Sequence, residues 1–283
     1  MTSWNSAEAL AQLPTPVIDA HHHLGPRGRL SGDQSDFREN EVLPLHLAAM
    51  DRHGIAQACL IASHSGLMDW TGTAQRVNDV VASVIKREPT RFAVGIGTVD
   101  PGAGVPGIEE IDRCVQDLGF KAMAWHSRFQ GSFVDSPVMY QYIRHCAALN
   151  VPVFLHVLAE SNAEAIWRFA KVTREIPEAR FVALDPFSSM DQSQWVNDVG
   201  GDLPNVWWET GCLFGAGQQL QKFVEHHGPS RVVFGSDYYA EHRSSFPGAM
   251  YDVLNTDWAV ADKAAILGGN IRELFGLQAA EAP

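Results

Sequence analysis

Short apolar runs rich in β-branched residues recur along the whole of this chain. They are nearly continuous in apolar residues, which is typical of strands buried on both faces of a parallel sheet. We therefore expect eight strands that pair in parallel. The runs cover residues 17–23, 55–63, 92–100, 120–126, 152–157, 180–185, 205–211 and 231–237.

Helical patterns lie between these runs. Residues 73–87 place Val77, Val81 and Val84 on one side, and Pro89 then ends the helix. Eight strands that alternate with helices predict an α/β fold of the (β/α)8 TIM-barrel type, whose usual length is about 250 residues. An open doubly wound sheet is the alternative, but no GxGxxG motif follows the first run. Further helices are expected at 108–118, 137–149, 163–176, 218–227 and 257–275.

The sequence shows no repeat and no linker that would divide it. We therefore expect residues 1–283 to form a single barrel domain. The segment 25–44 is long, polar and rich in glycine, so we expect it to be a loop over the mouth of the barrel.

The charge balance limits the partners of this protein. Its 21 Lys and Arg against 33 Asp and Glu give a formal charge of −12, which argues against nucleic acid or an anionic membrane as a partner. No apolar run approaches the roughly 20 residues of a membrane span, and the first residues do not resemble a secretory signal. The four cysteines are far apart in the sequence, so we expect a reducing, cytoplasmic compartment. With nucleic acid and membrane disfavoured by the charge, we expect the partner to be a small-molecule substrate.

Histidine and acidic residues repeatedly stand at or near the ends of the apolar runs. In a (β/α)8 barrel, the carboxyl ends of the strands meet at one face, and this face carries the active site. Packing alone does not explain such polar ends, so we expect a functional site there. The residues are His21, His22, His23, His126, His156, Asp185, Glu209 and Asp237.

His21 and His23 should point the same way, because side chains alternate along a strand. His22 then faces the helical layer, where a hydrogen-bonded core histidine is the expected role. His156 lies in the apolar run PVFLHV, where a core role is also open, and a buried Asp237 needs a cation or a hydrogen-bond network. Three imidazoles and a carboxylate would suit a divalent ion such as Zn²⁺ with one position left for water.

Taken in order, these motifs resemble the amidohydrolase superfamily, in its branch of TIM-barrel enzymes related to aminocarboxymuconate-semialdehyde decarboxylase. The matching stretches are IDAHHH at 18–23, GFK at 119–121, PVFLH at 152–156, FGSDY at 234–238 and ILGGNIRELFG at 266–276. The resemblance implies that one divalent ion, zinc or alternatively manganese, is bound by His21, His23, His156 and Asp237. It also suggests a homodimer.

One position departs from the pattern of this family. A histidine usually ends the sixth strand, whereas Asp185 stands there in this chain. Asp185 either takes over the acid–base task, or it caps the next helix or pairs with an arginine. The departure also leaves a metal-free variant of the site open. We therefore treat Asp185, together with Asp237, as a candidate catalytic residue.

Residues beside the predicted strand ends are candidates for binding substrate. His126 and Arg128 follow the fourth run and Arg243 follows the eighth, and a guanidinium suits a substrate carboxylate. Trp125 offers an apolar wall for a ring, although packing in the barrel explains it equally well.

Three functions compete at this point. The favoured one is metal-dependent hydrolysis of a lactone, amide or related carbonyl bond in a small carboxylate-bearing or cyclic substrate, with Asp237 carrying the proton. The alternative is non-oxidative decarboxylation of an aromatic or unsaturated acid, which the absent sixth-strand histidine weakens. The third is an inactive barrel that only binds a ligand, and four costly buried polar groups argue against it.

Overall fold

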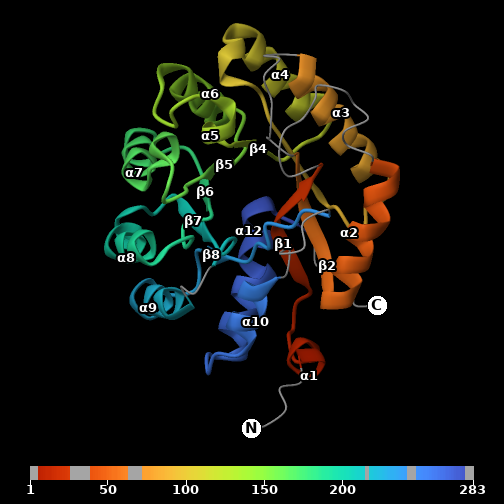
Figure 1. Cartoon of the computed structure of the whole chain (residues 1–283), viewed down its shortest axis with the longest axis vertical. Coiled ribbons are helices and arrows are strands. Elements are labelled where there is room, and N and C mark those ends of the chain that lie inside the picture. Colours follow the sequence, from red (N-terminus) through yellow and green to blue (C-terminus); the bar gives the residue numbers. More distant parts are fainter. Residues whose placement is uncertain (1–5, 26–38, 63–71, 214–216, 241–246, 278–283) are drawn as a thin grey trace.

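The computed structural model places eight parallel strands side by side in the order β1 to β8, curled into a barrel with helices around it (Figure 1). It describes residues 6–25, 39–62, 72–213, 217–240 and 247–277. The fold is therefore a (β/α)8 TIM barrel, as the sequence predicted. The strands are β1 (Val17–Leu24), β2 (Ile55–Ala62), β3 (Val94–Gly97), β4 (Ala122–Trp125), β5 (Val153–His156), β6 (Phe181–Leu184), β7 (Val206–Glu209) and β8 (Val232–Val233).

The barrel closes through residues that follow the short strand β8. The backbone N–H of Ala20 donates to the carbonyl of Phe234, and that of His23 donates to the carbonyl of Tyr238, both at 2.9 Å. The sequence predicted one strand over 231–237, but regular pairing with β7 ends at Val233. The chain beyond β8 pairs instead with β1, which brings the GSD segment next to the histidine motif.

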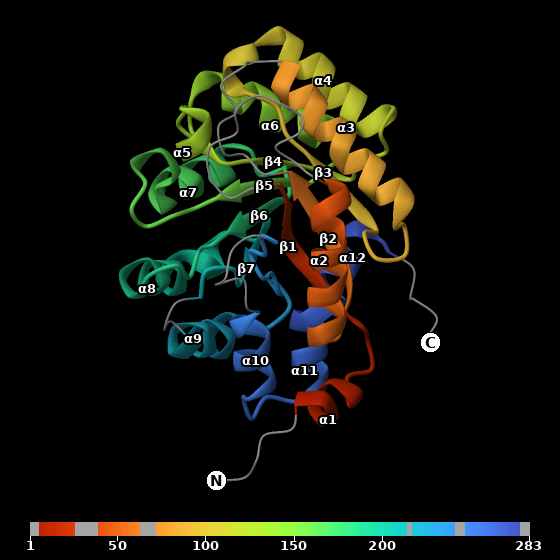
Figure 2. The same ribbon diagram turned by 45° about the vertical axis from the view of Figure 1, so that its right-hand side comes forward.

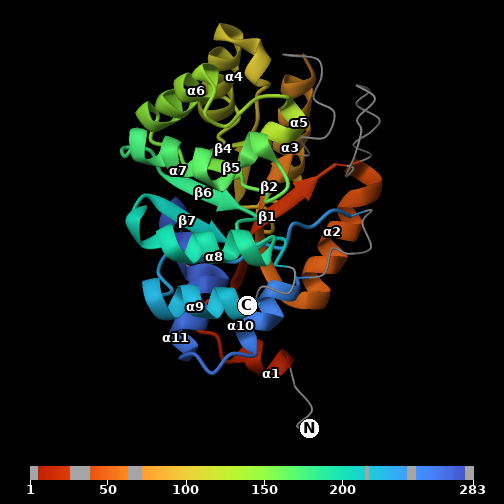
Figure 3. The same cartoon turned by 60° about the vertical axis from the view of Figure 1, so that its left-hand side comes forward.

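Helices cover the outside of the sheet. Figure 2 shows α2 and α3 beside β2, and Figure 3 shows α7, α8 and α9 in succession beside β6 and β7. None of the helices in the described ranges is both long enough and apolar enough to cross a membrane. The helices are α1 (Ser6–Ala11), α2 (Glu39–His53), α3 (Gly72–Arg87), α4 (Val105–Gln116), α5 (Ser127–Gln130), α6 (Pro137–Ala148), α7 (Ile166–Glu175), α8 (Met190–Val199), α9 (Gly217–His227), α10 (Gly248–Leu254), α11 (Val260–Ala264) and α12 (Asn270–Phe275).

Two predictions about the helical layer need correction. The loop predicted over 25–44 is too long, because α2 already begins at Glu39 and contains Pro44, and residues 26–38 lie outside the described ranges. The single helix predicted over 257–275 is divided into α11, the π-helical turn η5 (Ala265–Gly269) and α12. This turn lies so close to β1 that a Cβ on Gly268 would overlap the carbonyl of Pro16.

Side-chain alternation divides the apolar core into two clusters. The inner cluster fills the barrel and includes Ala124 and Phe154. The outer cluster lies between the strands and the helices and includes Trp125 and Leu155. Neighbouring residues of one strand thus belong to different clusters, so the side chain after Trp125 returns toward the barrel axis.

An irregularity in β1 decides which histidines face the barrel axis. Ile18 and Ala20 belong to the inner cluster, so strict alternation would also turn His22 inward. The pairing of β1 with β2 shifts register between Asp19 and His22. A bulge of this kind adds one residue to β1, and it turns inward the two histidines that flank His22.

Candidate metal centre and cavity

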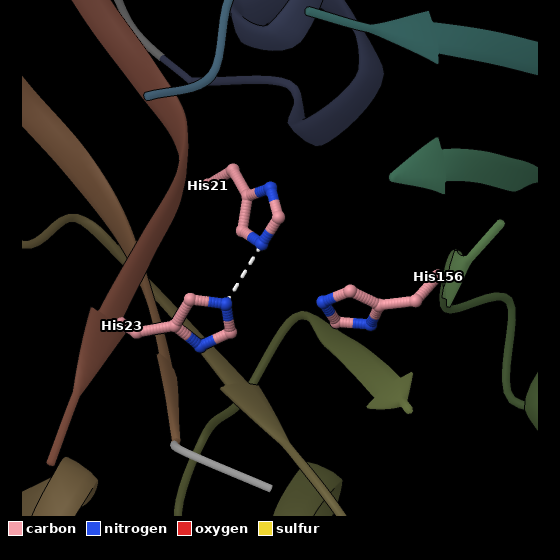
Figure 4. A group of neighbouring side chains, drawn as sticks. All are labelled: His21, His23 and His156. Atoms are coloured by element: carbon pink, nitrogen blue, oxygen red, sulfur yellow. Dashed lines mark hydrogen bonds between the residues drawn. The ribbon is translucent and has the colours of Figure 1, made fainter. Parts of the chain in front are cut away.

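Three imidazole rings from opposite sides of the barrel meet at the carboxyl ends of the strands (Figure 4). The Nε2 atoms of His21 and His23 are 2.8 Å apart. The ring of His156, on β5, lies with its centroid 5.2 Å from that of His21 and 5.8 Å from that of His23. One nitrogen of each ring lies within 4.8 Å of the others. The structure thus brings together three residues that lie far apart in the sequence.

The carboxylate of Asp237 lies against this group. Its Oδ1 is 3.5 Å from Nε2 of His21 and 3.4 Å from Nε2 of His23. Asp237 follows β8 with a left-handed φ of 51°, a conformation that is costly for a residue with a Cβ. This turn of the backbone directs the carboxylate toward β1.

Buried acceptors set the tautomers of two of the rings. The Nδ1–H of His21 donates to Oε2 of Glu209 at 3.2 Å, and that of His156 donates to the carbonyl of Trp125 at 3.0 Å. A neutral imidazole with a proton on Nδ1 carries its lone pair on Nε2. Both rings are therefore prepared to bind a cation through Nε2.

The residues present fit a divalent metal ion. Two imidazole nitrogens only 2.8 Å apart need a proton or a cation between them. Burial would lower the pKa of His21, but Glu209, with Asp185 and Asp237, raises it to about 10. The carboxylates thus favour positive charge at this point of the barrel. Imidazole and carboxylate together suit Zn²⁺ and related divalent ions.

Asp185 faces the same group of side chains from the end of β6. Its Oδ1 lies 3.7 Å from Nδ1 of His21, and the residue is 3% exposed with a left-handed φ of 60°. Burial and the charge of Asp237 raise the pKa of Asp185 well above its ordinary value. It does not cap the next helix, because Oγ of Ser189 accepts the N–H of Gln192 at the start of α8.

Cys212 joins the two aspartates on this side of the site. Its Sγ–H donates to Oδ2 of Asp237 at 3.2 Å. One ligand atom from each of Asp185, Cys212 and Asp237 lies within 4.8 Å of the others. These three side chains form an acidic side of the site, which adjoins the histidine group through Asp237.

A cavity of about 160 Å³ borders both groups, and a cavity of this size holds one small ring. Its other side is lined by His126 and Arg128, two of the residues that the sequence assigned to substrate. The ring of His126 stacks on that of His156, with centroids 4.0 Å apart. Another hollow, of about 210 Å³, lies beside α9 and α10 and contains none of the site residues.

The sequence analysis missed Glu164, which holds this second side of the cavity. Its Oε1 accepts the Nδ1–H of His126 at 2.5 Å and the backbone N–H of Arg128 at 2.9 Å. Burial raises the pKa of Glu164 to about 7. Its position, in a turn after β5, carries no sequence signal, because a glutamate at the start of a predicted helix is ordinary.

The structure does not bring every predicted residue to the site. His22 faces the helical layer, where its Nδ1–H donates to Asp19 at 2.9 Å and its Nε2 lies 2.8 Å from Nδ1 of His46. Trp125 is fully buried in the outer cluster and does not line the cavity, although its carbonyl accepts the Nδ1–H of His156. Arg243 lies outside the described ranges.

The sequence model of the amidohydrolase family matches residues 18–277, so the chain belongs to this family. A 2-amino-3-carboxymuconate-6-semialdehyde decarboxylase of Dictyostelium discoideum is 31% identical over 241 residues, which cover 72% of this chain and 66% of that protein. A gamma-resorcylate decarboxylase of Rhodococcus jostii (strain RHA1) is 26% identical over 209 residues, which cover 62% of this chain and 61% of that protein. The chain thus spans less than two thirds of the length of these relatives.

A solved structure shares the fold over almost the whole chain. The 5-carboxyvanillate decarboxylase of Novosphingobium aromaticivorans, complexed with manganese and 4-hydroxy-3-methoxy-5-nitrobenzoic acid, has a TM-score of 0.71 and 17% identity. The match covers 94% of this chain and 97% of that one. At this identity the likeness shows the shared barrel.

These comparisons correct the expected chemistry. The sequence favoured a hydrolase, but the two relatives named above are decarboxylases. The expectation of hydrolysis is therefore wrong, and decarboxylation, the alternative, is the better supported reaction. The absent histidine on β6 had weighed against it, yet the relatives carry more weight than one position.

Proposed function

We propose that this protein is a metal-dependent decarboxylase that acts non-oxidatively on a small aromatic or unsaturated carboxylic acid. The observation that carries the proposal is the meeting of three imidazoles and Asp237 beside a cavity large enough for one ring. The relatedness to decarboxylases supports the type of reaction.

His21, His23, His156 and Asp237 hold the metal ion in this proposal. Zinc suits the three imidazoles, and manganese, which is present in the neighbouring carboxyvanillate enzyme, is the alternative. A divalent ion bound there supplies positive charge that attracts substrate oxygens and stabilises negative charge on them. Glu209 keeps the ring of His21 oriented for this task.

Arg128 and His126 bind the polar groups of the substrate. Arg128 lies at the exposed mouth of the cavity, where its guanidinium contacts Glu160 at 3.1 Å. An exposed ion pair contributes little free energy, so a substrate carboxylate can replace Glu160 at low cost. His126 lies deeper, with its ring stacked on that of His156, and it binds a second polar group of the substrate.

Asp185 and Asp237 handle the proton. When CO2 leaves, the bond between the carboxylate and the ring carbon breaks, and its electron pair stays on the carbon. A proton must then be delivered to that carbon. Asp185 lines the cavity from the end of β6, which places its carboxyl group to deliver that proton, and Asp237 lies beside it.

The proposal is tested by measuring CO2 release. Metal-loaded protein is offered gamma-resorcylate, 5-carboxyvanillate, 2-amino-3-carboxymuconate 6-semialdehyde and a wider panel of aromatic acids. We expect release from at least one acid, its loss after chelation and its return with Zn²⁺ or Mn²⁺. His156→Ala should lower both metal content and CO2 release. No release from any acid, or release that survives complete removal of metal, contradicts the proposal.

We also propose a homodimer in the reducing cytoplasm. The resemblance to the family supports the dimer, and the four unpaired cysteines fit the compartment. Sedimentation of the purified protein over a range of concentrations tests the dimer, and a single monomeric species contradicts it.

A further inference from the structure

Glu164 is a buried carboxylate that the proposed reaction does not use. It is fully buried, and its Oε2 has no hydrogen-bond partner among the described residues. The ion pair that it forms among the described residues is with the imidazole of His126. Burying a carboxylate in this way costs free energy, so its position calls for an explanation beyond packing.

A single oxygen of Glu164 holds two residues of the cavity wall. Its Oε1 accepts the ring Nδ1–H of His126 and the backbone N–H of Arg128. The backbone N–H of His126 is in turn held by the side chain of Gln130 at 2.9 Å. The carboxylate therefore anchors the start of α5, from which both candidate substrate-binding residues project.

Two contacts also fix the plane of the His126 ring. One face of the ring stacks on His156 at a centroid distance of 4.0 Å, and the ring of Phe129 contacts the His126 ring at a centroid distance of 4.1 Å. Glu164 holds the Nδ1 edge. A ring held by one face and one edge has a single orientation, and its tautomer follows from the acceptor at Nδ1.

We propose that Glu164 is a positioning residue that keeps the proton of His126 on Nδ1, so that Nε2 accepts a hydrogen bond from a hydroxyl or amine of the substrate. The part of this inference that concerns substrate binding rests on the proposed function, whereas the part that concerns the tautomer of His126 does not. The inference predicts that the protein prefers acids that carry a hydroxyl or amine donor, because a site built around an acceptor discriminates against ligands without a donor.

The state of the ring is tested by nitrogen NMR of protein labelled with ¹⁵N-histidine, at about pH 9, where Glu164 is ionised. The His126 signals are assigned by their loss in His126→Leu. We expect the Nδ1–H tautomer in the wild type and in Glu164→Gln, which keeps an acceptor oxygen. Glu164→Leu removes the acceptor, and we expect the Nε2–H tautomer to become populated. The control Glu175→Leu, at an exposed glutamate on α7, should leave the signals unchanged.

Substrate binding is tested with 4-hydroxy-3-methoxy-5-nitrobenzoic acid as a probe that carries a phenolic hydroxyl. In metal-loaded protein, Glu164→Leu should weaken its binding roughly tenfold or more, and Glu164→Gln much less. The double variant with His126→Leu should lose clearly less binding than the sum of the two single losses, because Glu164 acts in large part through that ring and otherwise only through the backbone N–H of Arg128. Metal content should not change.

Two results would overturn the inference. One is an unchanged Nδ1–H tautomer in Glu164→Leu, and the other is additive loss of probe binding in the double variant. Neither depends on turnover, so failure of the proposed decarboxylation is seen separately, as absent CO2 release with the tautomer still governed by Glu164.

Discussion

Glu209 and His21, which lie 188 positions apart in the sequence, share a hydrogen bond of 3.2 Å inside the barrel. The same carboxylate accepts the backbone N–H of Asp185 at 3.1 Å and that of Gly211. One buried side chain on β7 therefore ties together the ends of β1, β6 and β7. It fixes both the ring of a candidate metal ligand and the turn that carries a candidate acid.

Replacing Glu209 by Gln should weaken metal binding. The amide keeps the shape but removes the charge that favours a cation beside His21, and partners of this kind contribute about 10- to 100-fold in metal affinity. The affinity is measured by competition with a chelator of known strength. Glu225→Gln, at an exposed position of α9, serves as the control. Unchanged affinity in Glu209→Gln would show that the contact has no role in metal binding.

Asp185→Asn tests the assignment of the proton donor. The variant keeps the size of the side chain but cannot supply the proton, so turnover should fall roughly 10²-fold or more, the scale of general acid catalysis. Metal content and thermal stability should stay close to those of the wild type. If turnover is also close to wild type, Asp237 alone handles the proton.

His22→Ala should destabilise the fold without emptying the metal site. The ring is buried, hydrogen-bonded to Asp19 and stacked on Tyr238 at 4.7 Å, so its removal should cost about 2–4 kcal/mol of unfolding free energy. Urea unfolding measures the loss, and elemental analysis measures the metal. His23→Ala is the counterpart, for which we expect loss of metal with a smaller loss of unfolding free energy. Metal loss in His22→Ala at wild-type stability would contradict this assignment.

Gly235→Ala should distort the site through simple crowding. A Cβ at this position would overlap the carboxylate of Glu209 and lie 2.6 Å from Cβ of His21. Such overpacking costs about 1–3 kcal/mol and displaces both side chains. Thermal melting and metal content are the measurements, with Gly217→Ala as the control, since its Cβ would be 3.7 Å from the nearest atom. Equal melting temperatures for the two variants would rule out this crowding.

The sequence by itself determined the eight strands, the family and the helices α3, α4, α6, α7 and α9, whereas the helices α1, α5, α8 and α10 were not predicted. These features depend on local periodicity and on short motifs, which can be read within a window of a few residues. Helix α2 was missed because Pro44 lies inside it, and proline ordinarily marks a helix end. The strand β8 was predicted too long because the GSD segment that follows it pairs with β1 instead.

Only the tertiary structure decided how the site is assembled. The inward direction of His21 and His23 depends on a bulge set by pairing with β2, and the aim of Asp185 and Asp237 depends on left-handed turns after β6 and β8. Glu164 acquires its role only because the fold places it within 2.5 Å of His126. The physical reason is that sequence patterns report which face of an element is buried, whereas contacts between strands depend on register, closure and backbone turns that form when the barrel assembles.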